Sequence, residues 1–142
     1  MKLSTRGEYA MKAMHYLAMN HGRVVRIQEI AEAEFIPLKY LEQILLILKN
    51  TGLVASKRGL KGGYYLAKKP EDITFGAVIR TVDGPLAPIS CASQTAYERC
   101  PQERGCDIRN VWLDIREAIA NILDNKNFGE FRKEKKYHRI IV

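Results

Sequence analysis

Apolar residues recur every three or four positions in three N-terminal stretches, which is the spacing of helices that bury one face. These stretches span residues 4–20, 27–34 and 38–49. The second and third are separated only by a tight turn around residues 35–36. Two helices joined in this way predict a helix-turn-helix unit.

A basic, glycine-rich turn follows the third helix. Residues 57–63 read KRGLKGG and lie between two strand-like segments, residues 53–56 and 64–66. Apolar and aromatic runs on either side of such a turn predict a β-hairpin, and directly after a helix-turn-helix this hairpin has the position of a wing. Residues 70–82 then predict a fourth helix, which completes a winged helix-turn-helix domain over residues 1–83.

The C-terminal part of the chain contains one long amphipathic helix, predicted over residues 107–125 from its apolar spacing. We expect its stripe to pair with the same helix of a second subunit, giving a homodimer; the alternative is packing against its own domain alone. An irregular loop over residues 84–106 precedes it, and we expect the charge-rich segment 126–142 to be a mobile tail. The predicted fold class is mainly α with a small β-hairpin wing.

Positive charge is concentrated in the first half of the chain. The net charge is +7, and residues 1–69 hold twelve of the 23 Lys and Arg but only five of the 16 Asp and Glu. A basic module of this kind suits a polyanion such as duplex DNA, although a basic face kept for solubility is the alternative. No apolar run approaches the length needed to cross a bilayer, so we expect a cytoplasmic protein with no membrane partner.

The exposed side of the third predicted helix carries polar groups suited to reading base edges. Gln43 can bond adenine and Glu42 can accept from cytosine, while Lys39 and Tyr40 suit a phosphate or a base edge. An ordinary solvated face is the alternative for these four residues. The basic turn just downstream favours DNA binding.

The predicted wing and the start of the first helix add candidate phosphate contacts. We expect Arg58 to enter the minor groove and Lys57 and Lys61 to neutralise phosphates. Thr5 and Arg6 begin the first helix, where the positive helix end can hold a phosphate. The glycine spacing of the turn matches neither a dinucleotide fingerprint nor a P-loop.

Three cysteines, Cys91, Cys100 and Cys106, lie close together on the predicted loop with spacing Cys-x8-Cys-x5-Cys. Thiolates select iron-sulphur clusters, zinc or copper(I), and the lack of a Cys-x2-Cys pair or nearby histidines places a cluster ahead of zinc. Thiols that respond to oxidants without a metal are the alternative. No histidine is placed to activate a cysteine nucleophile, so we expect no enzyme.

The segment IPLKYLEQIL, followed by LKNTGLVASKRGLKGGYYLAKKPEDITFGAVIRTVDGP, resembles the IscR, NsrR and CymR family of bacterial winged-helix regulators. The likeness runs from residue 1 to about residue 131. Members of that family bind DNA as homodimers, and many hold an iron-sulphur cluster on three cysteines between the last two helices. The resemblance therefore implies Cys91, Cys100 and Cys106 as cluster ligands. The CymR branch lacks this cysteine set, so the chain is more similar to the cluster-binding IscR-like members.

Two departures from the family pattern concern the cluster. The first cysteine spacing is longer than the usual five residues, and Arg109 stands where IscR has a histidine, three positions after the third cysteine. In NsrR-like members an acidic residue near the N-terminus of the other subunit completes the site, which implies Glu8 here. The alternative role for Glu8 is to stabilise the helix dipole. We place a 2Fe-2S cluster ahead of 4Fe-4S.

The sequence thus predicts a repressor or dual regulator whose cluster state alters its fit to a palindromic operator. The resemblance puts control of iron-sulphur cluster assembly first, and a nitric-oxide or redox response next. Two further alternatives are a thiol-based regulator without a cluster, and a small metalloenzyme or electron carrier on a DNA-binding-like scaffold.

Overall fold

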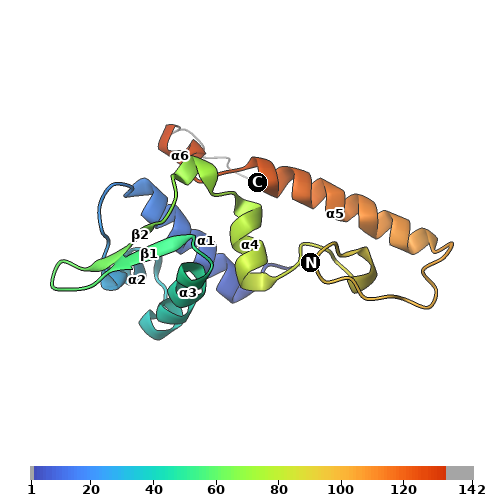
Figure 1. The fold of residues 1–142 in the computed structure, drawn as a ribbon, viewed down its shortest axis with the longest axis horizontal. Helices are drawn as coiled ribbons and strands as arrows, with labels where there is room; N and C mark the ends of the chain where they lie inside the picture. The colour runs from blue at the N-terminus through green and yellow to red at the C-terminus, as the bar shows by residue number, and fades with distance from the viewer. Residues whose placement is uncertain (1, 134–142) are drawn as a thin grey trace, which may run out of the picture.

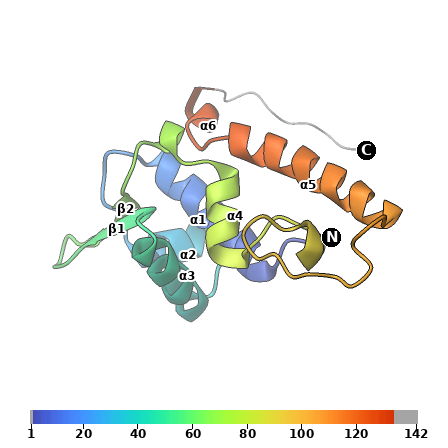
Figure 2. The same cartoon turned by 45° about the vertical axis from the view of Figure 1, so that its right-hand side comes forward.

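The computed structural model describes residues 2–133 and confirms a mainly helical fold with one two-stranded hairpin (Figure 1). Helices α1 to α4 and the hairpin form a compact head, and α5 extends away from it (Figures 1 and 2). The elements are α1 (Thr5–Met19), α2 (Ile27–Glu34), α3 (Leu38–Asn50), β1 (Val54–Lys57), β2 (Gly63–Leu66), the 3₁₀ turn η1 (Pro70–Asp72), α4 (Phe75–Asp83), the 3₁₀ turn η2 (Ser90–Ala92), α5 (Asp107–Asn125) and α6 (Glu130–Lys133).

The core lies between α1, α3 and α4. On α1 the buried side chains are mostly small, and Ala10, Ala13 and Ala18 allow neighbouring helices to approach closely. α3 contributes the larger aliphatic residues Leu41, Ile44, Leu45 and Leu48, all fully buried. Since these four residues occupy one face of α3, its polar residues are left facing outward.

The boundaries of the helix-turn-helix follow from local chemistry. Ser4 caps α1, because its Oγ accepts a hydrogen bond from the amide of Gly7 at 2.9 Å. Phe35 ends α2 in the left-handed region, with φ of 54°. Pro37 directly precedes α3, so its missing N–H costs that helix nothing.

The hairpin is joined to the helix-turn-helix through Val25. β1 and β2 pair antiparallel, from Val54 opposite Leu66 to Lys57 opposite Gly63. Val25 then pairs with Tyr64 through two backbone hydrogen bonds of 2.9 and 2.7 Å. A Cβ on Gly63 would lie 2.2 Å from the carbonyl oxygen of Val25, so this approach requires glycine.

Residues 126–133 pack on the head, and the expectation of a mobile tail beginning at residue 126 is wrong for this part. Phe128 is fully buried, and its ring contacts Phe75 with centroids 4.7 Å apart. Asn127 forms a bridge with Thr74, so the backbone is also held. Phe131 of the same segment also stacks on Phe75, with ring centroids 5.7 Å apart. Two aromatic residues therefore anchor a segment that otherwise looks charged and solvated. Residues 134–142 of the expected tail lie outside the described residues.

Within residues 2–133, no helix has the length and apolar content that a membrane span requires.

Candidate DNA-binding surface and cysteine loop

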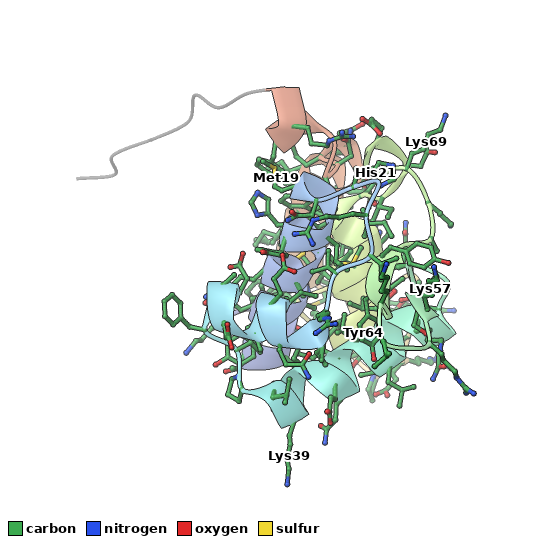
Figure 3. All side chains as sticks on the ribbon, turned by 90° about the vertical axis from the view of Figure 1, so that its left-hand side faces the viewer. Met19, His21, Lys39, Lys57, Tyr64 and Lys69 are labelled. Carbon is green, nitrogen blue, oxygen red and sulfur yellow. The ribbon has the colours of Figure 1, made fainter. Side chains whose placement is uncertain are left out.

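The outward face of α3 carries the four residues that the sequence predicts to read bases. Lys39, Tyr40, Glu42 and Gln43 are all exposed, and Figure 3 shows Lys39 pointing away from the start of the helix. The ring of Tyr40 meets the ring of Tyr9 edge-on, with centroids 5.5 Å apart. This contact with α1 restricts Tyr40, whereas the other three side chains project into solvent.

The wing carries three exposed cations on a constrained backbone. Lys57, Arg58 and Lys61 are exposed, and the loop between β1 and β2 extends beyond the helices of the head (Figure 1). A Cβ on Gly62 would lie 2.3 Å from the carbonyl oxygen of Lys57, so the turn closes tightly only with glycine there. Exposed cations on a narrow, firmly held hairpin suit contact with the DNA backbone.

At the start of α1, Thr5 and Arg6 are exposed, but the helix end already faces a carboxylate. Asp83 of α4 accepts hydrogen bonds from the amide of Ser4, at 3.1 Å, and from the Ser4 hydroxyl. A negative group therefore already occupies the position that a phosphate would take at this helix end. No local pattern predicts this contact, because 79 positions separate Ser4 and Asp83.

A polar cluster of Tyr16, Arg23 and Glu29 joins α1 to α2. Glu29 accepts a hydrogen bond from the Tyr16 hydroxyl at 2.8 Å and from Arg23 Nη1 at 3.2 Å. The Arg23 guanidinium, with help from Tyr16, holds the pKa of Glu29 below its usual value. The hydrogen bond to Glu29 in turn raises the pKa of Tyr16.

Two arginines of α5 hold the cysteine loop. Arg109 Nε donates to the carbonyl oxygen of Cys91 at 3.1 Å, and Arg116 Nη1 donates to that of Ala92 at 2.8 Å. Cys106 is the N-cap residue of α5. The amide of Glu103 donates to the carbonyl oxygen of Cys100 at 3.1 Å, within the same turn-rich segment.

All three cysteines are free, half-buried thiols. Their residue type suits a soft metal centre, and Arg109 attaches the Cys91 segment to the same end of α5 as Cys106. Within residues 2–133, however, no three Cys, His, Asp or Glu side chains are gathered closely enough to hold a metal ion. The donor types therefore fit a cluster, while a complete ligand set is not assembled in the single chain.

Glu8, the expected fourth ligand, is exposed in the first turn of α1 and pairs with Lys12, with Oε1 and Nζ 3.4 Å apart. In the single chain Glu8 thus forms an ion pair between successive turns of α1. Two of the three histidines lie within the described residues: the ring of His15 meets that of Phe131, with centroids 5.2 Å apart, and His21 is exposed.

Within residues 2–133, the apolar stripe of α5 is only partly covered. None of its residues is buried, and Ile108, Val111 and Ile122 are 68%, 56% and 63% exposed. α5 contacts mainly α4 of the head and η2 of the cysteine loop. Large aliphatic side chains at helical spacing are thus available to a further partner.

Sequence reasoning missed Arg109 and Arg116 as residues that hold the loop, and Asp124 as the partner of Arg80. Arg109 lies near the start of α5 and Arg116 near its middle. An arginine on a helix that follows an irregular loop is only a weak signal for such contacts. No local sequence pattern predicts the pairing of Arg80 with Asp124, because 44 positions separate the two residues.

Comparison with known proteins supports a regulatory role. The family model Rrf2, described as an iron-dependent transcriptional regulator, matches residues 3–134. The HTH-type transcriptional regulator IscR of Aliivibrio salmonicida is 35% identical over 141 residues, which cover 99% of this chain and 82% of that protein.

Two solved structures have the same fold. T. potens IscR superimposes with a TM-score of 0.78 at 29% identity, covering 100% of this chain and 93% of that chain. CymR, the global cysteine regulator of B. subtilis, superimposes with a TM-score of 0.76 at 33% identity, covering 96% and 99%.

Proposed function

Since the chain belongs to the Rrf2 family of transcriptional regulators, and is therefore not an enzyme, we propose that it is a cytoplasmic, dimeric repressor or dual regulator of transcription. It binds a palindromic operator in duplex DNA, and an iron-sulphur cluster on its cysteine loop controls that binding. The observation that carries the proposal is the combination in one chain of an exposed polar face on α3, a rigid basic wing and three half-buried free thiols.

The DNA-binding step uses α3 and the wing together. α3 enters the major groove, where Glu42 and Gln43 contact base edges and Lys39 and Tyr40 contact a phosphate or a base edge. The wing lies alongside, with Arg58 in the minor groove. The proposed phosphate contacts are Lys57 and Lys61 of the wing and Thr5 and Arg6 at the start of α1. Asp83 makes the contact at Thr5 and Arg6 the weakest of these, because it already faces that helix end.

Dimerisation uses the exposed stripe of α5. A second copy of α5 would cover Ile108, Val111 and Ile122, which are more than half exposed. A two-fold dimer places two recognition helices on half-sites about one helical turn apart. Sedimentation should give a dimer for the wild type, and a monomer for the variant in which Val111 and Ile122 are both replaced by lysine.

The sensing step uses Cys91, Cys100 and Cys106 as ligands of the cluster, 2Fe-2S ahead of 4Fe-4S, with Glu8 from the second copy as the fourth ligand. When bound, the cluster supplies a site whose charge and stability respond to iron supply, oxidants or nitric oxide. Cluster assembly is the process that we place under its control, ahead of a nitric-oxide or redox response. For the cluster to control DNA binding, it must favour one arrangement of the loop and α5 relative to the head over another arrangement.

An anaerobic absorption spectrum of freshly purified protein tests the cluster, with iron and acid-labile sulphide measured per subunit. A brown protein with visible charge-transfer bands supports the proposal. Colourless protein that takes up neither iron nor sulphide on anaerobic reconstitution contradicts it. A duplex-binding assay over a range of salt concentrations tests the DNA-binding part separately.

A thiol-based regulator without a cluster is the second candidate. It is favoured by the fact that the three thiols are not gathered into a metal-binding group, and by the likeness to CymR. In that case colourless protein would lose or gain operator affinity on treatment with peroxide, and dithiothreitol would reverse the change.

A further inference from the structure

The tip of the wing presents a large apolar side chain to solvent. Leu60 is 93% exposed and lies between the basic residues Arg58 and Lys61. A leucine in this position buries almost nothing within the chain, so it contributes little to the stability of the head. Its side chain is therefore available to a partner outside the chain.

The backbone at this tip is held from the helix-turn-helix side. Arg26, the N-cap residue of α2, donates from Nη2 to the carbonyl oxygen of Leu60 at 2.7 Å. Its side chain makes no capping hydrogen bond to α2. Inside the turn, the amide of Gly62 donates to the carbonyl oxygen of Gly59 at 2.9 Å. The backbone of Leu60 is therefore attached to the start of α2.

We propose that Leu60 is a minor-groove contact of the wing and that Arg26 is the residue that positions it. This inference rests on the proposed DNA-binding function. Apolar side chains pack against the sugars and base edges of the minor groove, where they need no hydrogen-bond partner. In that groove the 2-amino group of guanine is the main obstacle to a close apolar contact. Leu60 therefore adds a preference for A·T pairs beneath the wing.

The role of Arg26 differs from that of the wing cations. The neighbouring residue Val25 already pairs with Tyr64 of β2, and the Arg26 hydrogen bond extends this attachment from the strand to the tip. A guanidinium that holds the Leu60 carbonyl acts on DNA through Leu60. A direct bond from Arg26 to a phosphate is the alternative outcome of the test below.

The first measurement is the affinity of the wild type and Leu60→Ala for a duplex that the wild type selects from random 30-base-pair DNA. Removing the leucine side chain beyond Cβ should weaken binding about tenfold. The salt dependence should stay unchanged, because Leu60 carries no charge. Met19→Ala is the matched control: Met19 is also an exposed apolar residue, at the end of α1 far from Lys39 (Figure 3), and its variant should bind like the wild type.

Base analogues locate the contact in the minor groove. Each A·T pair in the outer part of the selected site is replaced in turn by G·C or by inosine·C, which lacks only the 2-amino group of guanine. Under the wing, the wild type should bind the inosine duplex more tightly than the G·C duplex, and Leu60→Ala should lose this difference. An equal difference in both proteins would overturn the assignment of Leu60.

A double-mutant cycle tests Arg26. If Arg26 acts through the tip, Arg26→Ala weakens binding in the wild type but has little further effect in Leu60→Ala. Additive effects would overturn the positioning role and indicate a direct phosphate contact. If the wild type shows no salt-sensitive duplex binding, the proposed function itself fails. If instead the wild type binds and Leu60→Ala binds equally well, only this inference fails.

Discussion

Arg80 on α4 and Asp124 near the end of α5 are joined by two parallel hydrogen bonds, Nη1 to Oδ1 at 2.6 Å and Nη2 to Oδ2 at 2.8 Å. This two-pronged geometry fixes the relative orientation of the two groups. The pair connects the DNA-binding head to the long helix. A Cβ on Gly76 would lie 2.0 Å from Asp124 Oδ1, so the absence of a side chain at Gly76 makes room for the carboxylate.

The contribution of this ion pair to stability should depend on pH. The Arg80 guanidinium holds the pKa of Asp124 below its usual value. Because the folded-state pKa is the lower one, the stabilisation is present above the unfolded-state pKa and is lost as the pH falls below about 4. Asp124→Asn should lower the free energy of unfolding by at most about 1 kcal/mol at pH 7, since the pair is exposed to screening.

Urea unfolding of the wild type and Asp124→Asn at pH 7 and pH 3 measures this effect. The difference between the two proteins should shrink at pH 3, below the unfolded-state pKa, because the unfolded chain then binds a proton that folded Asp124 resists. A difference that is as large at pH 3 as at pH 7 would show that the charge of Asp124 is not what stabilises the junction.

Phe128 should be essential to the stability of the fold although it follows the long helix. It is fully buried against Phe75, so Phe128→Ala should cost about 3–5 kcal/mol, the range for removing a buried aromatic side chain. Phe131→Ala is the matched control, because Phe131 is 39% exposed and should cost about 1 kcal/mol. Chemical unfolding measures the loss in free energy of unfolding for both variants. If Phe128→Ala loses no more than Phe131→Ala, Phe128 is not the anchor of this segment.

Arg58→Ala should weaken operator binding about tenfold and reduce the slope of log affinity against log salt. The reason is the loss of one cation from the exposed wing. Lys126→Ala provides the control, because Lys126 is exposed at the C-terminal end of α5, outside the wing, and pairs with Glu130. Anisotropy titrations over a salt series give both quantities, and equal affinity for the wild type and Arg58→Ala would contradict the assignment of the wing.

Cys100→Ala should abolish cluster uptake and leave folding and dimerisation intact. Cys100 is half-buried in a loop and makes no disulfide, so a smaller side chain leaves the head undisturbed. Absorption spectroscopy after anaerobic reconstitution and sedimentation of the same sample are the two measurements. If Cys100→Ala unfolds the dimer instead, the metal centre has a structural role.

The sequence was sufficient to predict elements whose chemistry is local. The second helix was predicted at its observed bounds, and so was the long helix over residues 107–125, because apolar periodicity and flanking turns determine both. The exposed residues of α3 and the wing followed from the same patterns. The anchor at Phe128 was missed because two aromatic residues in a short charged segment are too few to show a helical or strand periodicity. The contacts of Arg26 with Leu60 and of Asp83 with Ser4 join distant parts of the chain, and no local rule predicts them.

The long helix α5 is attached to the head mainly at its C-terminal end. Its C-terminal end is fastened to the head by Asp124, by the bridge at Asn127 and by Phe128, while its N-terminal end carries Cys106. Nineteen residues span roughly 28 Å at about 1.5 Å per residue. A tilt of about 5° at the attached end therefore displaces the cysteine end by about 2.5 Å. The length of α5 thus converts a small rotation at the head into a movement of ångström size at Cys106.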